Sequence, residues 1–300
     1  MTKNRILKGV FLVAIGATSY GMLATFVKIA YSEGFTTPEV TVSQIINGVI
    51  AMLVISVFQK ATTKKEIIKP SAKNILHLIL AGTSIGFTSV FYYLSLNYIP
   101  VSIAIVLLMQ TVWIGVLFEM FLDKKTPSIS KIIAVIIVLI GTVLATNLIE
   151  NAIQIPWMGI FFGLLSAVSF TMTMISANRI ALEISSSQRS LLMLIGGAIV
   201  VLTFAFFSQT TPFNFDVFLK WGIVLAFFGT IIPPLLFNIG FPLTGIGLGS
   251  IVSALELPVS VMMAYFILDE DVNGIQWFGI TLIVLAIVIM NIDYRQFFKQ

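Results

Sequence analysis

Apolar segments of about 20 residues, the length of helix that crosses a bilayer, recur along almost the whole chain between short polar breaks. A helix in such a segment satisfies its own backbone hydrogen bonds in lipid. The first segment is longer than the apolar core of a signal peptide and lacks a clear cleavage site, so we expect a retained helix. The pattern predicts an all-α, multi-pass membrane protein with ten transmembrane helices, at about 7–31, 40–58, 74–98, 101–122, 130–149, 156–178, 189–208, 219–241, 246–268 and 275–292.

The overall composition supports this prediction. Hydrophobic residues make up 58% of the 300 and charged residues only 10%, with a mean hydropathy of +1.05. A soluble domain is about 25% charged, so much of this apolar surface is expected to face lipid. The chain has no cysteine and one histidine, His77, which excludes thiolate chemistry and a histidine-based metal site. No metal and no other cofactor are predicted.

The distribution of Lys and Arg predicts the orientation. If the N-terminus is cytoplasmic and ten spans alternate, only Lys28 and Lys220 of the 17 Lys and Arg lie on the outer side. This positive-inside bias places both termini in the cytoplasm. It also accounts for the basic run at 59–74 without a nucleic-acid partner. We expect a multi-pass protein of the cell membrane, that is, the plasma or inner membrane.

The two halves of the chain resemble each other weakly. An offset of 150 residues aligns Gly9, Ala17, Ser19 and Tyr20 with Gly159, Ala167, Ser169 and Phe170. Further along, an offset of 146 places Gln110 over Glu256. We therefore predict two repeats, residues 1–149 and 150–300, with five helices each. An odd number of helices inverts the second repeat, an arrangement that is typical of transporters with a substrate site near the midplane.

Glu256 is a carboxylate within the apolar stretch 246–268. A charged group at that depth is costly unless something compensates it, and it marks a functional site by default. Counting along the helices places it near mid-membrane with polar and aromatic residues of other spans, and Ser253 shares its helix face. Helix packing is the alternative role for this group. No catalytic residue is predicted, and the predicted substrate-binding residues are Glu256, Gln110, Tyr20, Phe170, Ser89 and Ser253.

Residues nearer the helix ends and the prolines suggest accessory roles. Lys28 either snorkels to the interface or lines an outer vestibule with Tyr93. Pro233 and Pro258 interrupt helical hydrogen bonding, and Pro258 is expected to free the carbonyl of residue 254. Each proline marks either a gate or a static kink.

A set of residues in the last two spans carries a family resemblance. Residues 248–280 contain Pro258 and Val259, an acidic residue about twelve positions later, and Gly279. This stretch, with Glu270 in the acidic position, resembles the C-terminal signature of the EamA-like transporters of the drug/metabolite transporter superfamily. The first half departs from the pattern, because Val112 and Lys124 stand at the proline and acidic positions. The first span is also similar to the family pattern at Gly16, Ser19, Gly21 and Lys28. The resemblance implies a fold of two five-helix repeats. It also implies a permease that carries amino acids, other metabolites or drugs, often out of the cell.

These features favour a secondary transporter, a permease that exports small metabolites such as amino acids or drugs by alternating access around a midplane site. Glu256 would bind a substrate ammonium group or carry a coupled proton. The alternatives are a scaffold or assembly protein without transport and a membrane-embedded enzyme. The enzyme is disfavoured because an HExxH motif and cysteine are absent and no second carboxylate accompanies Glu256 at its depth. The expected partners are a small-molecule substrate, coupled protons and the lipid bilayer, but no nucleic acid. The chain is expected to be a monomer or a weak homodimer.

Overall fold

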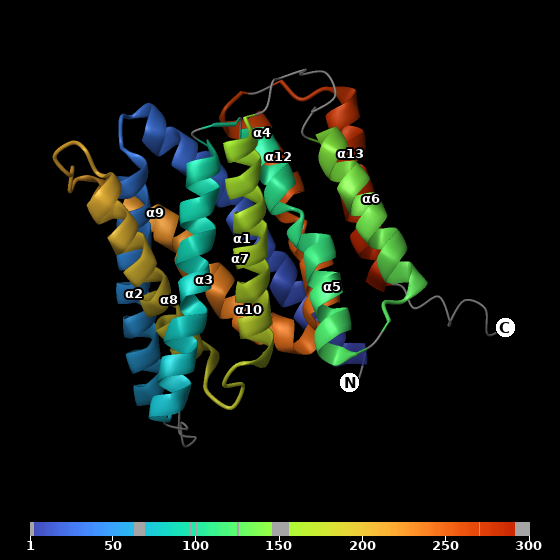
Figure 1. The fold of residues 1–300 in the computed structure, drawn as a ribbon, viewed down its shortest axis with the longest axis horizontal. Helices are drawn as coiled ribbons and strands as arrows, with labels where there is room; N and C mark the ends of the chain where they lie inside the picture. Colours follow the sequence, from blue (N-terminus) through green and yellow to red (C-terminus); the bar gives the residue numbers. More distant parts are fainter. Residues whose placement is uncertain are drawn as a thin grey trace.

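The computed structural model describes residues 3–62, 70–96, 98–99, 101–124, 126–145, 156–269 and 271–291. Within these ranges the chain is helical and contains no β-strand (Figure 1). The first half holds α1 (Lys3–Ser32), α2 (Thr37–Thr62), α3 (Ala72–Leu96), α4 (Val101–Leu108), α5 (Thr111–Asp123) and α6 (Ile129–Ala145). The second half holds α7 (Trp157–Arg179), α8 (Ser186–Ser208), η1 (Phe218–Gly222), α9 (Ile223–Ala226), η2 (Phe227–Ile231), α10 (Ile232–Thr244), α11 (Ile246–Ser253), α12 (Glu256–Ile267) and α13 (Gly274–Asn291). The segments η1 and η2 are π-helical.

Eight helical stretches of the described chain are long and apolar enough to cross a membrane. They are Asn4–Ser32, Thr37–Thr62, Ala72–Ser95, Ile103–Asp123, Trp157–Arg179, Ser186–Ser208, Phe218–Thr244 and Ile246–Ile267. Two shorter apolar helices, Ile129–Ala145 and Gly274–Ile289, stand where the other two spans were predicted. Large apolar side chains such as Phe121, Phe206 and Leu219 are exposed, which suits a lipid environment. The prediction of an all-helical, multi-pass membrane protein is confirmed.

The two halves run through the bundle in opposite directions. In Figure 1, α1 begins at the lower end, where α13 finishes, whereas α7 begins at the upper end. The helix α1 packs against α10 of the second half, and its counterpart α7 packs against α3 of the first. Helix α5 packs against α11, and α6 against α13. Each half therefore contributes equivalent helices to a shared core.

Two of the long spans are broken at equivalent points, between α4 and α5 and between α11 and α12. Gln110 in the first break has φ −59° and ψ −18°, and Leu255 in the second has φ −58° and ψ −20°. The N–H groups of both residues donate to the carbonyl three residues earlier, at 3.1 and 3.2 Å. A tight turn of this kind inside a helix interrupts the i to i−4 ladder and changes the angular position of the side chains that follow.

The backbone fixes the register of the repeat. Gln110 and Leu255 are 145 residues apart, and so are Lys124 (φ 51°) and Asp269 (φ 52°), the left-handed residues just after α5 and α12. This corrects the offset of 146 that the sequence suggested, because the counterpart of Glu256 is now Thr111 rather than Gln110. The earlier alignment matched polar side chains, which do not reveal where the backbone turns.

Acidic residues that follow α1 and α7 make related contacts at opposite ends of the bundle. Glu33 accepts hydrogen bonds from Lys220 Nζ at 2.8 Å and from Trp221 Nε1 at 2.7 Å, both at the start of the π-helical span. Glu183, 150 residues later, accepts one from Asn74 Nδ2 at 2.8 Å, at the start of α3. The hydrogen bonds from Lys220 and then Trp221 hold the pKa of Glu33 below its usual value. Glu33 is therefore charged at neutral pH.

The interface between α3 and α8 is a backbone-to-backbone contact that requires glycine. A Cβ added at Gly196 would overlap the carbonyl oxygen of Ile79, and one added at Gly82 would overlap that of Met193. Small residues allow this close approach of membrane helices. We expect Gly196→Val to destabilise the fold by about 1–3 kcal/mol, because backbone cannot move aside as a flexible side chain can. The midpoint of thermal unfolding in detergent measures this loss.

Gly274→Ala is the matched control for that experiment. A Cβ at this position, the first residue of α13, meets no described atom within 4 Å. Alanine also has a higher helix propensity than glycine, so the unfolding midpoint should stay or rise slightly. Equal losses in the two variants would mean that the α3–α8 contact is not the source of the effect.

Candidate functional site

A cavity of about 390 Å³ lies between the two halves of the bundle. Its walls come from α1, α2, α3, α4, α7, η2 and α12. The structure brings six of the predicted site residues to this cavity: Tyr20, Lys28, Ser89, Tyr93, Phe170 and Glu256. For Tyr20, Ser89, Phe170 and Glu256 this agrees with the predicted common depth. The roles of all six residues toward a substrate stay predictions.

Glu256 is the first residue of α12, directly after the break at Leu255. The N–H groups that follow it are already used: the Leu257 N–H donates to the Ala254 carbonyl and the Val259 N–H to the Leu255 carbonyl, both at 3.2 Å, and Pro258 has no N–H. Among the described residues, none forms a hydrogen bond or an ion pair with the Glu256 carboxylate, which lines the cavity. Gly21 lets α1 approach this point, since a Cβ there would lie 2.5 Å from the Glu256 carbonyl oxygen. The break therefore places an unpartnered carboxylate at the cavity wall.

Aromatic rings form a continuous floor below Glu256. The ring centroid of Tyr20 lies 6.1 Å from that of Phe170 and 5.7 Å from that of Phe237. Phe237 lies 4.9 Å from Phe241, which is fully buried. Gly16 of α1 leaves space for Phe237, because a Cβ there would lie 2.6 Å from the ring. Tyr20 and Phe170 line the cavity, whereas Phe237 and Phe241 are not among its lining residues and lie in α10, which leads to the α10–α11 turn.

Tyrosines form the opposite part of the wall. Tyr31 and Tyr93 lie 6.4 Å apart, and Tyr93 and Tyr92 lie 6.0 Å apart, both in edge-to-face geometry. Among the described residues, the titratable groups that line the cavity are Glu256, Lys28 and the tyrosines Tyr20, Tyr31, Tyr92 and Tyr93. Lys28 and Tyr31 lie near the end of α1, so the cavity extends from the aromatic floor toward that end of the bundle.

Hydroxyl groups in the wall donate to the protein itself. Thr88 Oγ1 donates to the Ser84 carbonyl at 2.7 Å, and Ser89 Oγ to the Ile85 carbonyl at 3.3 Å. Thr230 Oγ1 lies 3.1 Å from the carbonyl oxygens of both Ala226 and Gln44. Each hydroxyl has one proton, so these groups offer mainly acceptor lone pairs to anything in the cavity.

Several lining residues escaped the sequence analysis. Gln44, Tyr92 and Thr230 line the cavity, as do Tyr31 and Thr37. A polar Gln44 within an apolar span was a usable signal for α2. The contribution of η2 was not visible, because two π-helical segments rotate that span away from a regular helical wheel.

Two predicted binding residues lie away from the cavity. Gln110 donates through Nε2 to the Val106 carbonyl at 2.9 Å and accepts from Trp113 Nε1 at 2.7 Å. Ser253 is fully buried and donates to the Ser250 carbonyl at 2.8 Å. The helical wheel that selected Ser253 and the depth count that selected Gln110 both assumed unbroken helices, whereas each residue lies at or beside a break. Neither is among the residues that line the cavity.

Of the two proposed gating prolines, Pro258 stands in the first turn of α12, after the break at Leu255, and Pro233 is the second residue of α10, which continues directly from η2. The carbonyl of Ala254, expected to be free because of Pro258, accepts from the Leu257 N–H at 3.2 Å. Pro233 comes shortly after η2. In the π register its N–H would have donated to the Phe228 carbonyl, which instead accepts a hydrogen bond from Ser19 Oγ at 2.8 Å. Both prolines are buried. The prediction of a freed carbonyl at residue 254 is therefore wrong, and the gating roles stay predictions.

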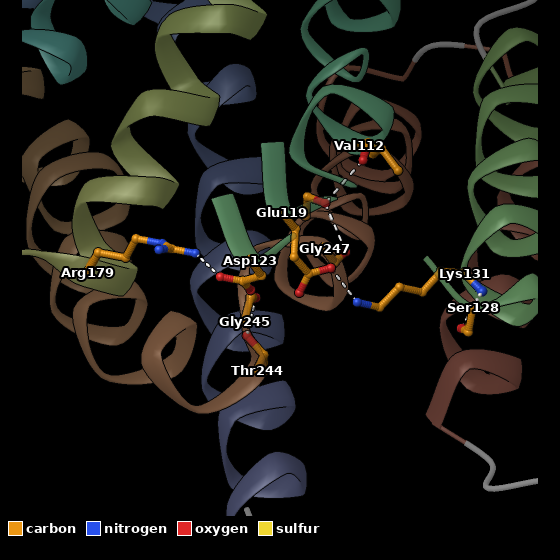
Figure 2. A network of polar contacts seen from close by, with 10 residues as sticks. Val112, Glu119, Asp123, Ser128, Lys131, Arg179, Thr244, Gly245 and Gly247 are labelled. Carbon is orange, nitrogen blue, oxygen red and sulfur yellow. Dashed lines mark hydrogen bonds and ion pairs between the residues drawn. The ribbon is translucent and has the colours of Figure 1, made fainter. Parts of the chain in front are cut away.

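Ion pairs fasten the end of the bundle beyond the aromatic floor. Figure 2 shows Glu119 and Asp123 of α5 between Lys131 of α6 and Arg179 at the end of α7. Lys131 pairs with Glu119 and Arg179 with Asp123. Thus α5 is tied to one neighbour on each side.

The same α5 end packs on the turn between α10 and α11. Gly245 in this turn has φ +77°, a left-handed conformation that glycine adopts without strain. A Cβ at Gly247 would overlap the Glu119 carboxylate. Ser250 Oγ donates to the Val112 carbonyl at 3.2 Å or to that of Gly247 at 3.0 Å (Figure 2). The two halves are therefore closed against each other at this end.

No group of three or more His, Cys, Asp or Glu that could hold a metal ion occurs in the described chain.

A family model of the EamA-like transporter family matches residues 7–147 and again residues 157–292. No curated protein matches the chain. Among solved structures, 29 chains match. One of them is a crystal structure described only as that of a protein. Its sequence is 14% identical to this chain, the alignment covers 94% of this chain and 96% of the matched chain, and the TM-score is 0.76. At this identity the likeness concerns the fold alone.

Proposed function

The chain belongs to the EamA-like transporter family, part of the drug/metabolite transporter superfamily, and we propose that it is a secondary transporter that exports small metabolites such as amino acids or drugs. The observation that carries this proposal is the cavity between the halves, with the unpartnered carboxylate of Glu256 in its wall. A site between two repeats, formed by discontinuous helices, is the arrangement that alternating access requires. We propose the cell membrane as its location.

The proposed topology has ten spans, with α6 and α13 as the shorter members. The first repeat comprises residues 1–149 and the second 150–300, and their boundary falls outside the described residues. Opposite helix directions and the shared offset of the two breaks support an inverted relation (Figure 1). The bias of Lys and Arg supports cytoplasmic termini. Monomer or weak homodimer is the proposed assembly.

The proposed mechanism places this structure in an outward-facing conformation. The cavity reaches Lys28, Tyr31 and Thr37 where α1 ends and α2 begins, whereas the aromatic floor and two ion pairs close the other end. Opening inward requires the ion pairs at α5 to separate. We propose that the breaks at Gln110 and beside Ser253, together with Pro233 and Pro258, act as hinges. Gln110 and Ser253 then reach the substrate only when the breaks move.

Transport into sealed proteoliposomes that contain only this protein tests the proposal. A panel of radiolabelled amino acids, monoamines, polyamines and nucleosides should include at least one solute whose flux exceeds that of empty liposomes. A pH gradient should drive that flux if protons are coupled to it. Absence of flux across the panel, together with chemical conversion of a solute, would favour the membrane-embedded enzyme instead. Absence of both flux and conversion would favour a scaffold.

A further inference from the structure

We propose that the cavity selects organic cations with an apolar body, and that Glu256 is the counter-ion of the substrate. This inference rests on the proposed function, because it names the substrate class of the same cavity. The sequence left two roles open for Glu256, and the geometry of the cavity favours the first.

The first argument is the missing partner of Glu256. Carboxylates inside membrane proteins pair with cations or backbone groups, because an uncompensated charge is costly there. Within the described chain, no side chain or backbone group fills this role for Glu256. A positively charged ligand would complete the site.

The second argument is the aromatic wall. Tyr20 and Phe170 lie below Glu256, and the tyrosines at 31, 92 and 93 lie toward the outer end. Each contact between a cation and an aromatic face contributes about 0.5–2 kcal/mol, and aromatic faces also bind apolar groups. Rings around a carboxylate therefore favour an ammonium group attached to a hydrocarbon body over a small hydrated ion.

The third argument is the direction of the hydrogen bonds. Thr88, Ser89 and Thr230 give their protons to backbone carbonyls, which leaves acceptors in the wall. Lys28 lies eight residues beyond Tyr20 on α1, about 12 Å at the helical rise of 1.5 Å per residue. Along α1, Lys28 is therefore displaced from Tyr20 toward the end of the helix, and no ion pair between described residues joins it to Glu256. These three hydroxyls therefore present acceptors to a ligand, which suits a cation better than an anion.

The test measures binding to the purified full-length protein, with radiolabelled benzyltrimethylammonium as the probe. This quaternary ion has no titratable proton, so its binding depends on the charge of Glu256 and not on proton exchange. We expect saturable binding, weakened about thirtyfold or more by Glu256→Gln. Glu256→Asp should retain part of the affinity. Glu183→Gln, an acidic residue outside the cavity, is the matched control and should bind as the unmodified protein does.

A pair of isosteres tests the inference without any substitution. Choline and 3,3-dimethyl-1-butanol have the same shape and differ in the positive charge, so choline should displace the probe and the alcohol should not. Equal displacement by both, no saturable binding, or full affinity in Glu256→Gln would each overturn the cation proposal. The proposed function fails separately. If only neutral or anionic solutes of the panel are transported, the protein is a transporter but the proposed cation selectivity is wrong. If cations bind but no solute is transported, the cavity is a binding site and the proposed transport function is wrong.

Discussion

Removing the charges of Lys131 and Arg179 together is expected to shift the cavity from outer to inner access. These residues hold α5 to α6 and α7 through Glu119 and Asp123 (Figure 2). The Arg179 and Asp123 side chains are 36% and 40% exposed, so water screens that pair, and the other is more buried. Together the pairs contribute about 1–2 kcal/mol to inner closure, or about a five- to thirtyfold change in population.

Labelling from either side of the membrane measures this shift. The chain has no cysteine, so Ser89→Cys introduces one thiol into the cavity wall. In oriented vesicles, a membrane-impermeant maleimide should label this thiol faster from the inner side in the Lys131→Gln/Arg179→Gln background. Labelling from the outer side should slow correspondingly.

Two further variants control for non-specific loosening. Exchanging the charges in Asp123→Arg/Arg179→Asp restores an ion pair and should return access to the outer side. Lys220→Gln removes the ion pair with Glu33, which lies at the opposite end of the bundle, and should not raise inner labelling. If inner labelling is unchanged in the double variant, or rises equally in Lys220→Gln, the contacts at α5 do not close the inner end.

Replacing Glu256 with glutamine is the second change with a large expected effect. Glutamine keeps the shape of the side chain and removes its charge. If Glu256 binds the substrate cation, both net flux and exchange of cationic solutes should fall about thirtyfold or more, because truncating a buried charge pair costs about 2–5 kcal/mol. If it only carries the coupled proton, pH-driven flux should disappear while passive exchange survives. Rates in proteoliposomes, with and without a pH gradient, separate these cases.

The interpretation of that variant depends on an intact fold. The unfolding midpoint of Glu256→Gln in detergent should match that of the unmodified protein, since no described group is bonded to the carboxylate. Unchanged transport with an intact fold would reduce Glu256 to a role in helix packing.

The sequence predicted the membrane class and most helix positions, because runs of apolar residues report directly on lipid exposure. It also brought Tyr20, Ser89, Phe170 and Glu256 to one depth, since rise along a helix depends little on local detail. These four residues line the cavity. Depth was therefore easier to predict than direction around the helix axis.

The predicted direction of side chains around the helix axis was wrong where the backbone departs from a regular helix. Ser253 was assigned to the site from a helical wheel, and Gln110 from its depth and its alignment with Glu256. Both assignments assumed continuous helices, which the turns at 109–110 and 254–255 interrupt. The π-helical segments moved Thr230 into the wall without any pattern in the side chains. The ion pairs at α5 were hidden for another reason, because they join residues whose proximity depends on how three helices pack.

Counterflow in proteoliposomes tests alternating access around one shared cavity most directly. Liposomes that contain only this protein are loaded with an unlabelled solute that the panel has identified as transported, and the labelled form is added outside. The account predicts that internal solute accelerates uptake of the label, because the loaded cavity returns to the outer side in exchange. It also predicts that Glu256→Gln removes the acceleration for a cationic solute. Uptake that is independent of internal solute, or slowed by it, would contradict alternating access.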